Sequence, residues 1–350
     1  MAEMGETKVG LSGDTFLINT RFLLIVSVFV GNIIEPLIGR NEEMRALFLW
    51  IFSFHMPLFV FVTGYFARYS LTGQPGKKVL QTIALQYFIF QTLYSVLDIL
   101  AFQVPGIKHS FFMPYLLCWF LMGHIIWRLM LLLFTFLKLK HPVLAAVGIA
   151  VLIGYGGFDG GVLSITRALV FLPFFVIGYS FDYARFRGLL SGYRRVIAAA
   201  LSVGLFIYFA ANAMELHPRW LVGALNYTQM GHGYWYAGVY RLALYGLQLA
   251  ASVGLLAFVP HGKSIMTDWG TRTLYVFLLH GFLVRLTVYS GIYAHIDHPL
   301  EIAALLVCTI GATILLAQPF VKKWTHLVIE PNTSWLNRME EKARGVLGAR

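Results

Sequence analysis

Charged residues and cysteines are scarce in this 350-residue chain, and each shortage excludes a class of protein. Asp, Glu, Lys and Arg together make up 12% of the residues, whereas about 25% is usual in soluble domains. Hydrophobic residues make up 58%, and the mean hydropathy is +0.71. A water-soluble globule, a disordered chain and a coiled coil are therefore excluded, because each needs a polar or charged surface. The two cysteines, Cys118 and Cys308, provide neither a disulfide framework nor a Cys-rich metal site.

Ten apolar segments account for most of the chain. A transmembrane helix needs about 20 residues, with a range of roughly 17–25, and all ten segments have such a length. The sequence therefore predicts an all-α polytopic membrane protein, a bundle of about ten transmembrane helices. The fifth segment is the shortest and ends in YGGFDGG. The segments span residues 16–38, 46–67, 79–103, 114–137, 141–157, 162–180, 194–212, 234–258, 271–292 and 300–320.

Lys and Arg are unevenly distributed among the connections between these segments. The even-numbered connections carry ten of them and the odd-numbered connections carry four. Cytoplasmic connections of membrane proteins are typically the richer in Lys and Arg. Both termini are therefore expected in the cytoplasm, with the protein in the inner (cytoplasmic) membrane of the cell. The four basic residues in the odd-numbered connections are Arg40, Arg45, Lys108 and Arg219.

Three regions follow from this pattern. Residues 1–15 form a cytoplasmic N-terminal segment, residues 16–320 the transmembrane domain, and residues 321–350 a cytoplasmic tail. The tail contains SWLNRMEEKARGVL, an amphipathic stretch that is expected to lie at the membrane surface. The net charge of +11 does not indicate nucleic acid as a partner, because membrane lipid and topology explain basic residues that are spread over the connections.

The first segment carries three polar residues on one face, Arg21, Asn32 and Glu35. The eleven-residue step from Arg21 to Asn32 turns a helix to within about 20° of three full turns. Ionisable residues at membrane depth are costly, so they are functional candidates by default. We expect the three side chains to line one internal cavity. The alternative is a snorkelling Arg21 with an interfacial Glu35.

Two histidines lie at membrane depth in the second and ninth segments. His55 is followed two residues later by Pro57, which interrupts the helical hydrogen bonds and is tolerated only beside protein or a cavity. His280 is next to Gly281, which permits the close approach of another helix or a ligand. Each histidine is either a functional group or a packing residue that is hydrogen-bonded across helices.

More than two residues from the ends of the segments, arginine outnumbers the acidic residues by five to two. Such an excess needs carbonyl partners or an anionic ligand, and the planar guanidinium suits phosphate. The fourth segment adds Trp119 and, four residues apart, His124 and Arg128. No metal site is predicted, since the histidines in the connections lack carboxylate or thiolate neighbours. The seven charged residues are Arg21, Arg128, Arg167, Arg241, Arg285, Glu35 and Asp98.

Five blocks of the sequence, in order, carry a resemblance to a known family. The two most specific motifs are FHMPLF, within FSFHMPLFVFVTGYFAR, and YVFLLHG, within TRTLYVFLLHGFLVR. The other blocks are NTRFLLIVSVFVGNIIEPL, MPYLLCWFLMGHIIWRL and RALVFLPFFVIGYSF. Together they cover most of residues 16–290, and they resemble the membrane acyltransferase-3 family, specifically its fucose 4-O-acetylase-like acetyltransferases.

The resemblance implies ten membrane helices and an O-acyltransferase. Such an enzyme moves an acyl group, usually acetyl, from acyl-CoA to a hydroxyl of a carbohydrate or glycolipid. Acetyl-CoA is then the expected co-substrate, no cofactor is bound, and membrane lipid is a further partner. The family pattern in the first helix is a basic residue, ten residues and a His. Arg21 fits this pattern, but Asn32 replaces the His, which favours an alternative: a non-catalytic transporter or binding relative that handles an acylated lipid or sugar.

The implied chemistry needs a base and a donor to the oxyanion. An imidazole, from His55 or His280, takes the proton of the acceptor hydroxyl as that hydroxyl attacks the thioester. Asparagine cannot take a proton near neutral pH, so Asn32 is a candidate donor instead. Asn32, Thr63 or an arginine can meet the negative charge of the tetrahedral intermediate.

Four further residues are candidates for binding the substrates. Arg21 and Arg128 are expected near the cytoplasmic face, where their guanidinium groups suit the phosphates of CoA. Trp119 offers an aromatic face to a substrate, with ordinary packing as the alternative. Glu35 shares a helix face with Asn32 and is assigned to the same substrate site.

Overall fold

The computed structural model describes residues 2–157 and 161–336, and every regular element in this part is a helix. The helices that match the ten predicted segments are α1 (Ala2–Ile34), α2 (Glu42–Ala67), α3 (Gly73–Leu100), α4 (Cys118–Phe136), α5 (Pro142–Leu152), α6 (Ile165–Tyr179), α8 (Tyr193–Ala211), α10 (Ala237–Leu256), α12 (Thr273–Tyr289) and α13 (Pro299–Leu316). Shorter helices lie between or after them: α7 (Tyr183–Leu189), α9 (Arg219–Val222), α11 (Ile265–Gly270) and α14 (Pro319–Ile329). The predicted all-α fold is confirmed.

Eight of the described helices are long and apolar enough to cross a membrane. The predicted fifth and ninth segments form shorter apolar helices, over Pro142–Tyr155 and Thr273–Tyr289. The fifth ends where the glycines of YGGFDGG begin, because glycine is a poor helix former. The chain is therefore a multi-pass membrane protein, as predicted.

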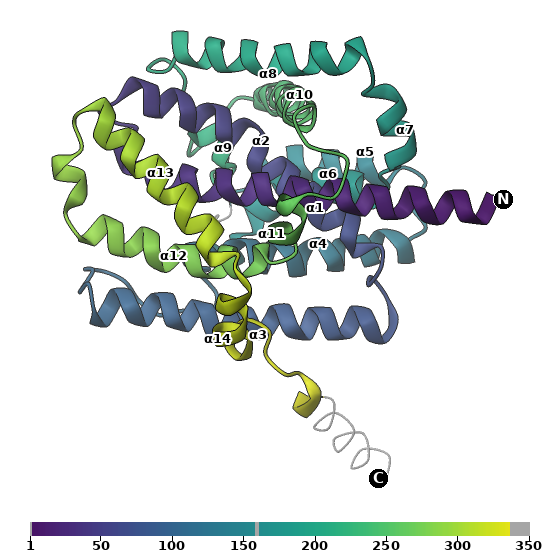
Figure 1. Ribbon diagram of the computed structural model, residues 1–350, viewed down its shortest axis with the longest axis horizontal. Coiled ribbons are helices and arrows are strands. Elements are labelled where there is room, and N and C mark those ends of the chain that lie inside the picture. The colour runs from purple at the N-terminus through teal and green to yellow at the C-terminus, as the bar shows by residue number, and fades with distance from the viewer. Residues whose placement is uncertain (1, 158–160, 337–350) are drawn as a thin grey trace.

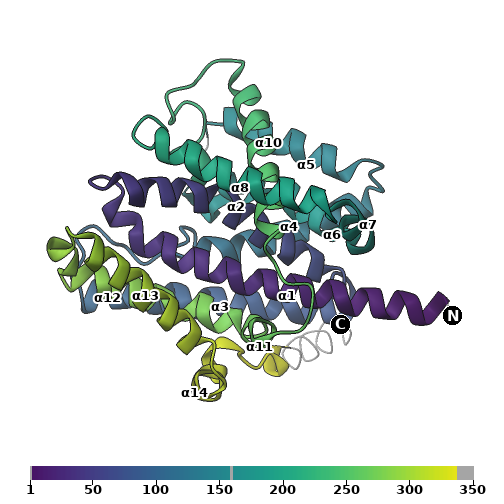
Figure 2. The ribbon, with the colours of Figure 1, turned by 45° about the horizontal axis from the view of Figure 1, so that its top comes forward.

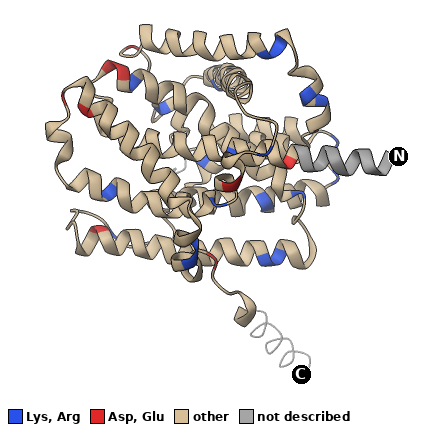
Figure 3. Ribbon diagram, in the orientation of Figure 1, with Lys and Arg blue, Asp and Glu red and all other residues tan. Residues whose placement is uncertain are grey.

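The first helix occupies the middle of the molecule. α1 has α2 on one side and α12 and α13 on the other (Figure 1, Figure 2). Charged residues are sparse along the central helices (Figure 3). In the most apolar stretch of α2, 83% of the residues are buried, against 17% in α8 and in α13. The outer helices thus present apolar side chains away from the bundle, as helices that face lipid do.

The second and sixth helices pack backbone against backbone. A Cβ atom added at Gly64 of α2 would overlap the carbonyl oxygen of Phe175, and one added at Gly178 of α6 would overlap that of Phe61. Small residues allow membrane helices to approach this closely. α2 carries His55 and α6 carries Arg167, so this contact fixes the relative position of two side chains of the site.

The connections between the helices gather at two ends of the bundle. Odd-numbered connections contact one another at one end, and even-numbered connections contact one another at the other. Arg45, in the first connection, donates from Nε to the carbonyl oxygen of Ala213 in the seventh, 2.6 Å away. Arg68, in the second connection, donates from Nη2 to that of Phe181 in the sixth, at 2.7 Å. Helices that cross a membrane in succession produce this alternation. The cytoplasmic placement of the even-numbered end and the three predicted regions stay predictions, and most of the predicted amphipathic stretch lies outside the described residues.

Candidate active site

Two cavities lie side by side inside the bundle. The first has a volume of about 410 Å³ and the second of about 360 Å³. Phe120 of α4 and Phe277 of α12 line both of them, so these two aromatic side chains separate the cavities. Their ring centroids are 5.3 Å apart, and Phe59 of α2 packs edge-on against Phe120 at 5.4 Å.

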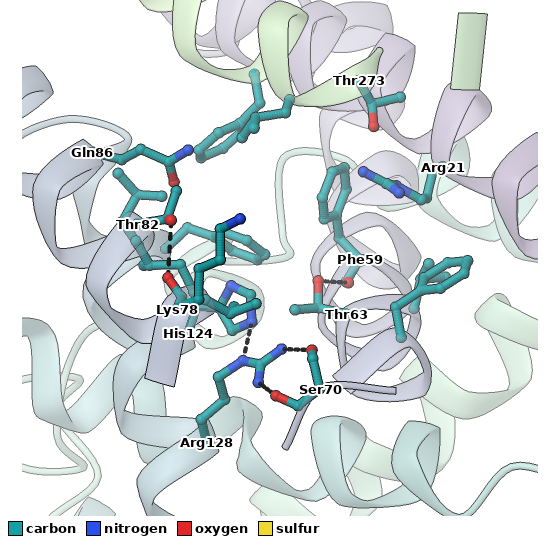
Figure 4. Close-up of a pocket in the computed structure, with 18 residues that line it drawn as sticks. Arg21, Phe59, Thr63, Ser70, Lys78, Thr82, Gln86, His124, Arg128 and Thr273 are labelled. Atoms are coloured by element: carbon teal, nitrogen blue, oxygen red, sulfur yellow. Dashed lines mark hydrogen bonds between the residues drawn. The ribbon is translucent and has the colours of Figure 1, made fainter. Parts of the chain in front are cut away.

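The first cavity, called the basic cavity here, is lined by Arg21 of α1, Lys78 of α3 and Arg128 of α4 (Figure 4). No Asp or Glu is among the described residues that line it. Arg21 lies 5.6 Å from the centroid of the Phe66 ring. Arg128 is buried and Arg21 is half-buried, whereas Lys78 is exposed near the start of α3. Three cations without a carboxylate favour an anionic ligand.

The guanidinium of Arg128 is held by neutral partners. Its Nη1 donates to the carbonyl oxygen of Ser70 at 2.6 Å, and its Nη2 donates to Ser70 Oγ at 3.1 Å (Figure 4). Its Nε donates to Nε2 of His124 at 3.0 Å, so the predicted i, i+4 neighbours are in direct contact. These bonds orient the guanidinium without neutralising its charge, and they leave two of its five N–H donors for a ligand.

The second cavity, called the imidazole cavity here, brings together five of the seven predicted site residues. α1 supplies Asn32, and Glu35 begins the 3-10 turn that follows α1. His55 comes from α2, Trp119 from α4 and His280 from α12. Both histidines and Trp119 are buried, whereas Glu35 is exposed. Side chains that are distant in the sequence therefore meet at one cavity.

The expectation that Arg21, Asn32 and Glu35 line one cavity is wrong for Arg21. Arg21 lines the basic cavity, while Asn32 and Glu35 line the imidazole cavity. Eleven residues of helix rise by about 17 Å, and within that distance Phe120 and Phe277 divide the interior. The helix face was correctly predicted, but the partition comes from two other helices.

The two buried histidines differ in whether their Nε2 atom has a hydrogen-bond partner. Nδ1 of His55 lies 2.8 Å from the carbonyl oxygen of Ile51, and Nδ1 of His280 lies 3.0 Å from that of Val276. A carbonyl only accepts, so each Nδ1 carries the proton and each Nε2 has a lone pair. Nε2 of His280 accepts from Asn32 Nδ2 at 3.2 Å. Nε2 of His55 has no partner among the described residues, so its lone pair is available in the cavity.

Arg167 of α6 is a residue of the imidazole cavity that the sequence did not single out. Its guanidinium carbon lies 3.6 Å from the centroid of the Trp119 ring. Its Nε has no hydrogen-bond partner within the described part of the chain, and its charge interacts with that of Glu35. The sequence shows Arg167 only as one of five arginines inside the segments. The stacking on Trp119, which identifies it, is a tertiary contact.

A second arginine of this cavity is already paired. Nη2 of Arg285 lies 2.6 Å from Oδ2 of the buried Asp98, and Nε donates to Oδ1 at 3.0 Å. Tyr115 also donates to Asp98 Oδ2, at 2.6 Å. Across the described ranges, no group of three or more His, Cys, Asp or Glu side chains is placed to hold a metal ion.

Comparison with known proteins adds one relative. Nodulation protein NolL of Mesorhizobium japonicum is 24% identical over 291 residues, which cover 75% of this chain and 74% of the relative. The chain is a distant homologue of this protein. No family model matches the chain, and no solved structure matches it.

Proposed function

We propose that the protein is an integral membrane O-acyltransferase that moves an acyl group from acyl-CoA to a hydroxyl of a carbohydrate or glycolipid. Acetyl is the acyl group that we propose. One observation carries the proposal. A cavity with three cations and no described carboxylate lies directly beside a cavity that offers a free imidazole nitrogen. The distant homology to Nodulation protein NolL supports the same reaction class.

The basic cavity is the proposed site of the CoA moiety. Phosphate groups match guanidinium and ammonium groups, and the charge of Arg21, Lys78 and Arg128 has no carboxylate beside it in the lining. Arg128 is already oriented by Ser70 and His124, so binding does not have to order it. For transfer, the thioester end has to reach the imidazole cavity, so the Phe120 and Phe277 side chains have to move apart to let it pass.

The imidazole cavity is the proposed site of transfer. The oxygen of the acceptor hydroxyl attacks the carbonyl carbon of the thioester, while Nε2 of His55 takes the hydroxyl proton. The tetrahedral intermediate collapses, the C–S bond breaks, and the thiolate of CoA receives that proton. His280 is held by Asn32 and by Val276, so its role is to shape the site rather than to accept the proton.

A second candidate function rests on the same Asn32. Asparagine stands where the family pattern has a proton-transferring His, and its amide occupies the lone pair of His280. A protein that binds or transports an acylated lipid or sugar without catalysis needs no second free imidazole. This candidate requires that the chain binds acyl-CoA or its product without turnover.

The test is acyl transfer by the purified full-length protein in detergent or nanodiscs. Acetyl-CoA labelled in the acetyl group is incubated with a lipid–sugar extract, and both CoA release and label in the acceptor fraction are followed. The proposal predicts release that depends on the extract and labels it in equal amount. Saturable binding of acetyl-CoA with no release of CoA would contradict the enzyme and support the second candidate.

A further inference from the structure

Acyl transfer from a thioester needs a hydrogen-bond donor at the oxygen that becomes negative. The sequence leaves Asn32, Thr63 or an arginine as candidates. One of the two N–H groups of Asn32 Nδ2 donates to His280, and the single Thr63 hydroxyl hydrogen is donated to the carbonyl oxygen of Phe59 at 2.8 Å. Thr63 also lines the basic cavity rather than the imidazole cavity. Thr63 is therefore excluded, and Asn32 keeps one neutral N–H group, whereas an arginine brings both N–H groups and a positive charge.

The arginines of the imidazole cavity are Arg167 and Arg285. Arg285 forms an ion pair with Asp98, which satisfies two of its nitrogens and compensates its charge. Arg167 makes no hydrogen bond within the described residues, and its Nε is buried without a partner. A buried guanidinium with unused donors is costly unless a ligand completes it. The charge of Glu35 in the same lining interacts with that of Arg167, but Glu35 accepts none of its N–H groups, so these groups are available to a developing anion.

The position of Arg167 is fixed in advance by aromatic packing. Its guanidinium carbon lies 3.6 Å from the centroid of the Trp119 ring, and Trp119 packs against Phe120 and Phe171 at 5.9 and 6.1 Å between ring centroids. Stacking leaves the edge of the guanidinium, with its N–H groups, free to donate. A donor that is ordered before the reaction lowers the barrier more than one that must reorganise.

We propose that Arg167 is a catalytic residue that donates to the oxyanion of the tetrahedral intermediate. The inference rests on the proposed acyl transfer. As the acceptor oxygen bonds to the thioester carbon, the carbonyl π pair moves to the carbonyl oxygen, and the N–H groups of Arg167 bind that oxygen. The proton of the acceptor goes to His55 Nε2. When the C=O bond reforms, the C–S pair leaves with CoA, which takes the proton from His55, and Arg167 is unchanged.

The structure also offers a matched control. Arg241 of α10 is buried in a membrane helix, lies 5.3 Å from the centroid of the Trp220 ring, and has an Nε without a partner among the described residues. It lines neither cavity. Replacing Arg241 therefore tests what the loss of a buried, tryptophan-stacked arginine does in general, apart from any catalytic role.

The experiment compares Arg167→Ala, Arg167→Lys and Arg241→Ala with the wild type, each checked for a monodisperse size-exclusion peak. With acetyl-CoA and the lipid–sugar extract, Arg167→Ala is expected to lose roughly 10²–10³-fold in kcat, the scale of one oxyanion donor. Its KM for acetyl-CoA should change less than about threefold, because the phosphates bind in the other cavity. Arg167→Lys should keep part of the rate, and millimolar guanidinium should restore part of the rate of Arg167→Ala. Arg241→Ala should retain the wild-type kcat.

Several outcomes would overturn the assignment. If Arg167→Ala keeps its kcat, or if only its KM rises, Arg167 does not stabilise the transition state. A rate that falls equally in Arg167→Ala and Arg241→Ala shows a structural effect and also overturns it. If a monodisperse Arg167→Ala cannot be obtained, Arg167→Lys decides. Lysine keeps the charge but lacks the planar guanidinium, so an unaltered kcat and KM in Arg167→Lys would refute the assignment. A wild type without turnover removes the proposed function, and this inference with it, whereas an active wild type beside an active Arg167→Ala removes this inference alone.

Discussion

Replacing Asn32 with alanine is expected to slow acyl transfer only modestly. The amide of Asn32 donates to Nε2 of His280 at 3.2 Å, and Nδ1 of His280 is fixed by Val276. One neutral hydrogen bond contributes about 0.5–1.5 kcal/mol, and about 1.4 kcal/mol corresponds to tenfold in rate. If Asn32 acts through the orientation of His280, Asn32→Ala should lose roughly two- to thirteenfold in kcat.

Initial rates of CoA release at saturating acetyl-CoA measure this loss. The double variant Asn32→Ala/His280→Gln tests the coupling, because two residues that act through one bond should not lose more together than the worse single variant. Asn32→His should remain active, since an imidazole N–H can replace the amide as donor to His280 and the related pattern has His there. A loss of 10²–10³-fold in Asn32→Ala alone would refute this reasoning, because it would show that the amide itself meets the oxyanion.

Three further predictions concern the donor site, the helix packing and the topology. Arg128→Met should raise the KM for acetyl-CoA by about tenfold or more at nearly constant kcat, because a charge-assisted hydrogen bond contributes about 1.5–3 kcal/mol; equal loss in kcat would contradict the assignment of the basic cavity. Gly178→Ala should lower the yield of monodisperse protein, since overpacking costs about 1–3 kcal/mol, while Gly148→Ala, which has no atom within 4 Å of the added Cβ, should not. Cysteines at Arg40 and Arg185, in a background without Cys118 and Cys308, should be labelled from opposite sides of the membrane, and labelling from the same side would refute the predicted topology.

The sequence was sufficient for the fold because the fold depends on length and apolarity. A run such as residues 46–67 can satisfy its backbone in lipid only as a helix, whatever it packs against. The fifth and the ninth predicted segments differ from the structure, because they form helices shorter than a membrane span. Their boundaries depend on glycines and on neighbouring helices, which composition alone describes poorly.

The site was only partly predictable. His55, His280 and Asn32 could be found because a polar group at membrane depth is conspicuous in an apolar sequence. Which histidine keeps a free lone pair could not be predicted, because Asn32 binds His280 across 248 residues of sequence. The division into two cavities depends likewise on Phe120 and Phe277, which the sequence offers only as two of 29 phenylalanines.

The central claim is that Nε2 of His55 is the base, and the ratio of two rates tests it most directly. His55→Gln and His280→Gln are both buried imidazole replacements in one cavity, so each serves as the control for the other. The structure predicts that His55→Gln loses on the order of 10²-fold or more in kcat, as the loss of a general base does. His280→Gln should lose about tenfold or less, because its Nε2 is already occupied. Near-normal turnover in a monodisperse His55→Gln, or a larger loss in His280→Gln, would contradict the account.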